Sequence, residues 1–214
     1  MLEVIDLSAG YKGIPIITGC SLAVDRGEIV GIRGRNGTGK STLLKAIAGE
    51  LPRLAGKVIV DGQEASPRIE DMLRCHRVGY LPQDGRNIPN LTVAENFFLA
   101  TGKPWPAGSD TGPFLERLDG CSRRMAANIS GGQSLALSLA IVLSLYDGVA
   151  YLILDEPSAG ADKKQVGDIA QMIKTAAAQS CGVLMVEQDI NLLTELADRV
   201  YECRDGTLQK SETS

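Results

Sequence analysis

The segment Gly34-Arg-Asn-Gly-Thr-Gly-Lys-Ser41 restricts the possible folds of this chain more than any other feature. It follows an apolar run at 28–33, which predicts a strand, and it precedes the run 41–48, which predicts a helix ending at Gly49. Glycines let successive backbone N–H groups turn inward, so a loop between a strand and a helix N-terminus can cradle phosphate groups. Lys40 then supplies positive charge for phosphates, and the Ser41 hydroxyl supplies a ligand for Mg²⁺. A glycine-rich turn without a ligand is the alternative, and the Lys-Ser pair argues against it.

Two carboxylates, Asp155 and Glu156, directly follow the continuous apolar run 149–154. Such a run predicts a strand buried on both faces of a parallel sheet. Ligands of open α/β sheets bind at the carboxyl ends of strands, where these two residues are expected. An Asp-Glu pair is also common on protein surfaces, but the strand before it and Pro157 after it favour a site.

A third segment, Ile129-Ser-Gly-Gly-Gln133, predicts a glycine-rich turn that opens a helix. Ser130 is a natural N-cap, and the glycines leave backbone N–H groups open to an anion. Because the chain already has one phosphate cradle, a second anion-binding helix N-terminus implies a second phosphate contact. Such turns also occur in unrelated proteins, so the order of the three segments carries the interpretation.

In this order, the three segments resemble the nucleotide-binding subunit of an ABC transporter. The resemblance implies a Mg²⁺-dependent ATPase in which Lys40, Gln83, Glu156 and Gln188 are catalytic, with Glu156 as the general base. It implies Mg²⁺ ligation by Ser41, Gln83 and Asp155. It also implies a head-to-tail dimer in which the 129–133 turn of one subunit contacts the ATP of the other. The implied ATP contacts are Tyr11, Gly34, Arg35, Asn36, Gly37, Thr38, Gly39, Lys40, Ser41, Thr42, Ser130, Gly131, Gly132 and Gln133.

Smaller features complete the resemblance. Gln83 opens a polar loop at 84–90 that resembles the Q-loop, which senses Mg²⁺ and the γ-phosphate. Tyr11 stands where the family places an aromatic residue against adenine, although a tyrosine packed on a hairpin is the alternative. The segment 158–162 resembles the D-loop between the two subunits, and Asp162 is also a predicted helix N-cap.

This chain also departs from the family pattern. Gln188 stands where most members have a switch histidine; glutamine donates hydrogen bonds but exchanges no proton. Two interpretations follow: either this chain hydrolyses ATP with Glu156 and Gln188, or it is a slow subunit whose partner carries the better site. Branched-chain amino-acid and urea importers share Val-Glu-Gln at this position, so we favour the first interpretation. Arg35 replaces a common proline, and it either adds charge to the cradle, as does Arg33 before it, or extends into solvent.

The predicted fold class is α/β: a P-loop NTPase with a mostly parallel central sheet, an antiparallel β edge layer and a small α-helical subdomain. One domain is expected over 1–214, with 1–89 and 134–214 forming the core and 90–133 the helical subdomain. The uncharged run 134–145 is too short for a membrane span of roughly 20 residues and predicts a buried helix. The expected edge strands lie at 4–6, 21–24 and 57–61, and the expected buried strands end near 33, 81, 154 and 186. Helices are expected to begin at the Thr92 capping box and at 162. We also expect a loop at 101–113, a terminal hairpin at 201–208 and a frayed end at 210–214.

Composition limits the partners. The net charge of −4 disfavours nucleic acid, which rewards basic surfaces. Five dispersed cysteines and a start without a signal peptide predict a cytoplasmic protein. The expected partners are a second ABC ATPase subunit, identical or related, and transmembrane permease subunits on the inner face of the membrane. An amino-acid-type importer is the favoured subtype, and an iron–sulfur assembly ATPase or a switch with little hydrolysis stays open.

Overall fold

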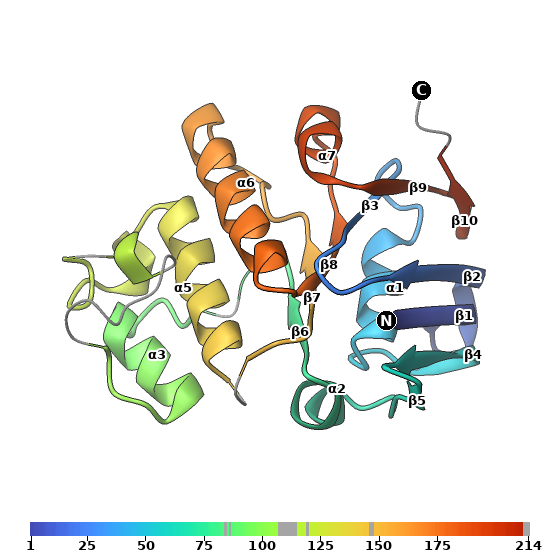
Figure 1. Cartoon of the computed structure of the whole chain (residues 1–214), viewed down its shortest axis with the longest axis horizontal. Coiled ribbons are helices and arrows are strands. Elements are labelled where there is room, and N and C mark those ends of the chain that lie inside the picture. Colours follow the sequence, from blue (N-terminus) through green and yellow to red (C-terminus); the bar gives the residue numbers. More distant parts are fainter. Residues whose placement is uncertain (84, 86, 107–114, 119, 146–147, 212–214) are drawn as a thin grey trace.

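The structure, a computed structural model, describes residues 1–83, 85, 87–106, 115–118, 120–145 and 148–211. Its strands form two sheets, and its helices pack on and beside them (Figure 1). Most of the predicted 101–113 loop, two residues of the predicted 84–90 loop and the last three residues of the chain lie outside the described part.

The larger sheet is mostly parallel, as predicted. Its order is β10-β9-β3-β8-β7-β6, with only β10 antiparallel to its neighbour. The strands are β3 (Ile29–Arg33), β6 (Val78–Leu81), β7 (Tyr151–Asp155), β8 (Gly182–Val186), β9 (Arg199–Arg204) and β10 (Thr207–Lys210). β9 and β10 form the predicted terminal hairpin, whose turn residues Asp205 and Gly206 both have positive φ.

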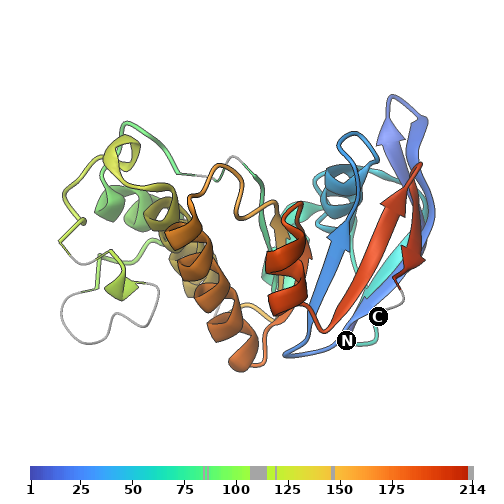
Figure 2. The same ribbon diagram turned by 90° about the horizontal axis from the view of Figure 1, so that it is seen from above.

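The smaller sheet is antiparallel, with the order β2-β1-β4-β5. It confirms the predicted edge layer, although its strands are longer than the expected runs. They are β1 (Leu2–Tyr11), β2 (Ile14–Val24), β4 (Arg53–Val60) and β5 (Gln63–Glu64). Figure 2 shows this sheet at one end of the molecule and helices α3 and α5 at the other.

The helices of the described residues are α1 (Lys40–Ile47), α2 (Ile69–His76), α3 (Val93–Thr101), α5 (Gly131–Ser144), α6 (Lys163–Ala178), α7 (Ile190–Leu196) and the short 3₁₀ helix η2 (Ala126–Asn128). Side chains cap the N-termini of α3, α5, α6 and α7. Thr92, Ser130 and Asp162 each form a capping box with the residue three positions later. α5 contains residues 134–144 of the uncharged run, buries Ala136–Ala140 and Val142, and continues across the predicted 133/134 subdomain boundary.

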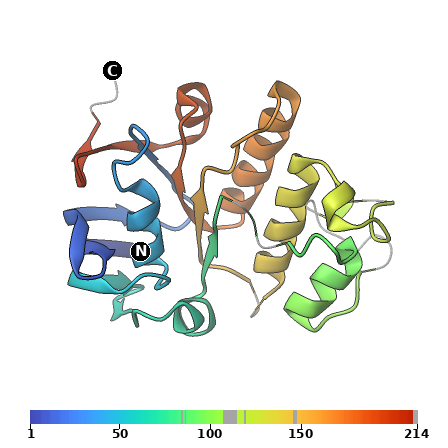
Figure 3. The ribbon, with the colours of Figure 1, turned by 180° about the vertical axis from the view of Figure 1, so that it is seen from behind.

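The central strands are apolar on both faces because each face packs on a different layer. On β7, Tyr151 and Ile153 join the core formed with α1 and the antiparallel sheet, whereas Leu152 and Leu154 join the core formed with α5, α6 and α7. Helix α1 contacts both β1 and β7, and it lies beside the antiparallel sheet in Figure 3. This two-sided burial explains why these strands read as continuous apolar runs.

The parallel register brings four strand ends to one edge of the sheet. Leu81 pairs with Leu154, Asp155 pairs with Val186, and Val186 pairs with Ile32. The residues that follow β3, β6, β7 and β8 are therefore neighbours, although they are far apart in sequence.

Candidate functional site

The glycine-rich loop connects β3 to α1, as predicted. Gly39 precedes α1 with φ of 98°, and a Cβ there would lie 2.7 Å from Ile17 Cγ2, so only glycine fits. No side chain caps α1 within the described residues, so its first N–H groups stay available for a ligand. They face a pocket of about 320 Å³ that is lined by Ile16, Asn36, Gly37, Gly39, Lys40, Ser41, Thr42, Gln83, Glu156 and Gln188.

Lys40 is buried beneath the loop, with 4% of its surface exposed. Its Nζ donates to the carbonyl oxygens of Gly34 and Arg35, at 2.9 Å each. These carbonyls hold the ammonium group at the pocket wall. A phosphate at the N-terminus of α1 would meet this charge together with the backbone donors.

Asp155 ends β7 directly behind the loop. The Ser41 hydroxyl donates to Asp155 Oδ1 at 3.1 Å. Burial raises the pKa of Asp155, and the charge of Glu156 raises it further, although the bond from Ser41 acts in the opposite direction. A hydroxyl beside a carboxylate fits Mg²⁺, which takes oxygen ligands from one or two protein groups, water and substrate phosphates.

No cluster of three or more histidine, cysteine or acidic residues that could hold a metal occurs among the described residues. The Ser41–Asp155 pair fits instead a cation that arrives with a phosphate ligand.

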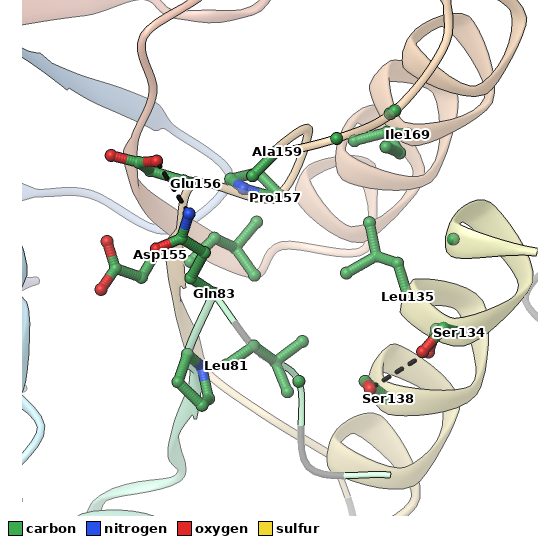
Figure 4. Close-up of a pocket in the computed structure, with 16 residues that line it drawn as sticks. Leu81, Gln83, Ser134, Leu135, Ser138, Asp155, Glu156, Pro157, Ala159 and Ile169 are labelled. Atoms are coloured by element: carbon green, nitrogen blue, oxygen red, sulfur yellow. Dashed lines mark hydrogen bonds between the residues drawn. The ribbon is translucent and has the colours of Figure 1, made fainter. Parts of the chain in front are cut away.

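Glu156 is held by two side-chain amides. Gln188 follows β8, and its Nε2 donates to Glu156 Oε1 at 2.7 Å. Gln83 follows β6, and its Nε2 donates to Glu156 Oε2 at 3.2 Å (Figure 4). The backbone of Glu156 has φ of 48°, a left-handed conformation that is uncommon for non-glycine residues and that turns the chain sharply after β7. Three strand ends thus converge on this one carboxylate beside the phosphate cradle.

The 129–133 turn opens α5. Ser130 Oγ accepts a hydrogen bond from the Gln133 N–H at 3.2 Å, and Gln133 Oε1 accepts one from the Ser130 N–H at 3.1 Å. None of residues 130–133 lines the 320 Å³ pocket of its own chain. Gly131 lines a smaller cavity of about 160 Å³ between α5 and the Glu156 strand end (Figure 4).

Eight of the predicted ATP contacts lie outside the lining of this pocket: Tyr11, Gly34, Arg35, Thr38 and the residues 130–133. Tyr11 ends β1 and is 49% exposed, and Arg35 is exposed on the loop. Arg33 forms an ion pair with Glu202 at 3.4 Å. Thr38 instead fixes the loop, because its Oγ1 donates to the Arg35 carbonyl at 2.9 Å.

Sequence reasoning missed Ile16, which is a large apolar residue of β2 and is 42% exposed at the pocket. Its signal was a pair of isoleucines, at 14 and 16, on one side of a hairpin strand. It also missed Glu187, a buried carboxylate directly after β8. The signal there was an acidic residue that continues an apolar run without a polar spacer.

The comparisons with known proteins agree with this geometry. The family model described as ABC transporter matches residues 17–159. A putative ABC transporter ATP-binding protein of Archaeoglobus fulgidus is 33% identical over 220 residues, covering 97% of this chain and 73% of the relative. The glutamate/aspartate import ATP-binding protein GltL of Escherichia coli K12 is 28% identical, covering 97% and 89%. Some relatives are longer, and this chain spans 43% of one of them.

Among solved structures, a dimeric bacterial ABC transporter cassette is 25% identical and superimposes with a TM-score of 0.81, over 99% of this chain and 98% of that one. No helix within the described part of the chain has the length and apolar character that a membrane crossing requires. The family model, the relatives and the fold agree: this chain belongs to the ABC transporter family and is one of its ATP-binding, ATP-hydrolysing cassettes.

Proposed function

We propose that two copies of this chain bind ATP between them and hydrolyse it to power an importer through separate permease subunits. The observation that carries this proposal is the convergence of Gln83 and Gln188 on Glu156 beside the lysine-bearing loop. Phosphoryl transfer needs mainly positioning and neutralisation of charge, and the pocket supplies both kinds of group.

Each group has a proposed role. Lys40 and the N–H groups of α1 bind the phosphates, and Ser41, Asp155 and Gln83 hold Mg²⁺, which neutralises phosphate charge when bound. Glu156 accepts the proton of the attacking water as general base. Gln83 and Gln188 fix the direction of its carboxylate through their two hydrogen bonds.

The second phosphate contact comes from the partner subunit. In one chain, residues 130–133 do not reach the phosphate pocket, yet Ser130 and Gly131 are exposed at the N-terminus of α5. A head-to-tail partner would place this N-terminus over the γ-phosphate. Residues 1–89 and 134–214 then act as the core, and 90–133 as the subdomain that presents the N-terminus of α5.

An apolar groove supports the proposal that this chain binds a permease subunit. It has a volume of about 260 Å³ and is lined in part by Ile88, Leu99, Ile141, Val142 and Leu145. Leu99 of α3 is 64% exposed. The groove includes Asn87 and Ile88, which follow Gln83 in the same loop, so a permease helix seated there would move with the nucleotide site. A permease helix in this groove would hold the chain at the inner, cytoplasmic face of a membrane.

The proposed cargo class is amino acids. The support is the Val186-Glu-Gln188 sequence, which resembles the branched-chain amino-acid type, together with the glutamate/aspartate import relative. The cargo itself would contact other subunits.

Replacing Glu156 with glutamine tests the hydrolytic role. Glu156→Gln should bind ATP with affinity close to that of the parent but lose about 10²-fold or more in kcat, the range for loss of a general base. Steady-state phosphate release and nucleotide titration measure the two effects. Hydrolysis by Glu156→Gln at the parent rate would reject Glu156 as the base.

A further inference from the structure

Glu187 is a buried carboxylate without a role in the chemistry described above. It follows β8 directly and has 2% of its surface exposed. The other buried charged residues of the described chain are Lys40 and Asp155, which both belong to the phosphate site. A buried carboxylate is costly unless donors surround it, so its contacts show what it holds.

The two oxygens of Glu187 serve two different segments. Oε2 accepts from the Ser158 hydroxyl at 2.7 Å and from the Ser158 N–H at 3.3 Å. Oε1 accepts from the N–H groups of Gln188 at 2.7 Å and Asp189 at 3.1 Å. The carboxylate therefore joins the segment after β7 to the loop after β8.

Both joined segments also end at Glu156. Ser158 lies two residues beyond Glu156, and the Gln188 side chain donates to Glu156 Oε1 at 2.7 Å. A displacement of Ser158 would act on the Gln188 backbone through a rigid carboxylate and two charge-assisted hydrogen bonds. The Gln188 amide would then shift relative to the oxygen that it holds.

We propose that Glu187 is a positioning residue that connects the segment 158–162 to Gln188, so that a contact made by 158–162 sets the Gln188–Glu156 hydrogen bond. This inference rests on the proposed function, in which two copies of the chain bind ATP between them, and on the D-loop resemblance, which implies that 158–162 lies between the copies. A correctly seated partner would align Gln188 and permit hydrolysis, and a separated partner would leave Glu156 less well oriented.

Amide hydrogen exchange on the nucleotide-free protein tests the connection without any catalysis. Ser158→Ala removes the shortest bond to Glu187 Oε2 and touches no atom of Gln188. We expect the Gln188 and Asp189 amides to exchange several-fold faster in Ser158→Ala, and the Ser158 amide to exchange faster in Glu187→Gln. Unchanged exchange at Gln188 in Ser158→Ala would overturn the proposal.

Asp189→Asn is a matched control, because this neighbouring acid caps α7 through Asn191 and Leu192 and asparagine caps equally well. It should leave exchange at Ser158 unchanged. Faster exchange at Ser158 in this control would mean that any change in the 187–189 loop loosens the segment, which would contradict a specific role for Glu187.

Kinetics provide the second test. Ser158→Ala and Glu187→Gln should each lower kcat about tenfold while KM stays within about twofold, the order expected when one hydrogen bond to a charged group is lost. When either substitution is combined with Gln188→Ala, kcat should fall little further than in Gln188→Ala alone, because all three substitutions act on one contact. Full additivity, or a rise in KM alone, would overturn the positioning role.

The two tests separate the possible failures. A parent protein that binds ATP but never hydrolyses it would contradict the proposed function. The exchange measurements on nucleotide-free protein would still decide whether Glu187 connects the two segments. Thermal unfolding of Ser158→Ala, the milder of the two variants, verifies that the fold is intact.

Discussion

At the scale of single residues, Glu156 has both carboxylate oxygens occupied by side-chain amides. An amide donates a hydrogen bond but neither carries charge nor exchanges a proton. Gln188 can therefore orient the proposed base and hydrogen-bond a phosphate, but it cannot relay a proton as a histidine would.

Substitution of Gln188 tests this orienting role. Gln188→Ala leaves Glu156 with one amide and should lower kcat about tenfold, the order for one hydrogen bond to a charged group. Gln188→His restores a donor and should recover part of the loss. ATPase assays of both variants measure this. Parent rates in both would show that Gln188 has no part in turnover.

The raised pKa of Asp155 predicts that the stability of the protein depends on pH. Its pKa is raised mainly by burial, so the native state binds a proton more tightly than the unfolded state. This contribution favours folding at pH values below the pKa of Asp155 in the unfolded state, which is near 4. It is lost as the pH rises through the pKa of Asp155 in the folded state.

Asp155→Asn should therefore melt at a higher temperature than the parent at pH 7 in the presence of a chelator, with a difference that shrinks toward pH 4. The variant should also lose the stabilisation that the parent gains from Mg²⁺ and ATP. Thermal unfolding across this pH range measures both effects. A lower melting temperature for Asp155→Asn at pH 7 would contradict the buried-charge interpretation.

At the scale of elements, the sequence predicted those whose signals are local. The continuous apolar runs at β3, β6, β7 and β8 and the caps at Thr92, Ser130 and Asp162 all lie within a few neighbouring residues. Strand lengths in the antiparallel sheet were underestimated, because β1 and β2 bury one face and alternate with solvent-facing residues.

The site was predicted only where a motif marks it. The loop 34–41 and the 155–156 pair follow strands, so their meeting at one edge was predictable from parallel topology. Ile16 and Glu187 owe their places to long-range packing of β2 and of the segment after β7, which no local pattern encodes. Tyr11 was assigned from resemblance alone, and it remains a proposed adenine contact.

The caps of α5 and α3 allow a matched comparison. Ser130→Ala and Thr92→Ala each remove a capping box and should each cost about 1 kcal/mol in the free energy of unfolding. Only Ser130→Ala should also weaken the ATP-driven dimer, because α5 is proposed to contact the partner's ATP and α3 is not. Chemical unfolding and light scattering measure the two effects. Equal weakening of the dimer by both variants would contradict the assignment to α5.

At the scale of the whole molecule, the phosphate pocket and the apolar groove share one loop, since Gln83 lines the pocket and Asn87 and Ile88 line the groove. Asn96 of α3 is 4% exposed and anchors the far end of this loop, where its Oδ1 accepts from the Ile88 N–H at 2.7 Å. The loop is thus fixed to α3 at one end and to Glu156 at the other.

Leu99→Asp tests the groove as the permease contact. A charge at this exposed groove residue should abolish recovery with a polytopic membrane protein from detergent extracts, while ATPase activity of the isolated chain stays at the parent level. Phe98→Asp is the matched control, because Phe98 is 58% exposed but does not line the groove. Recovery of the parent only with soluble assembly proteins would contradict the transport role.

The central claim is that ATP joins two copies of this chain across the Lys40 loop and the Ser130 helix N-terminus. The most direct measurement is the molar mass of Glu156→Gln by light scattering, with and without saturating ATP and Mg²⁺. We predict a monomer without nucleotide and a dimer with it, because blocked hydrolysis leaves both phosphate contacts in place. A monomer that persists while ATP saturates the site would contradict the account.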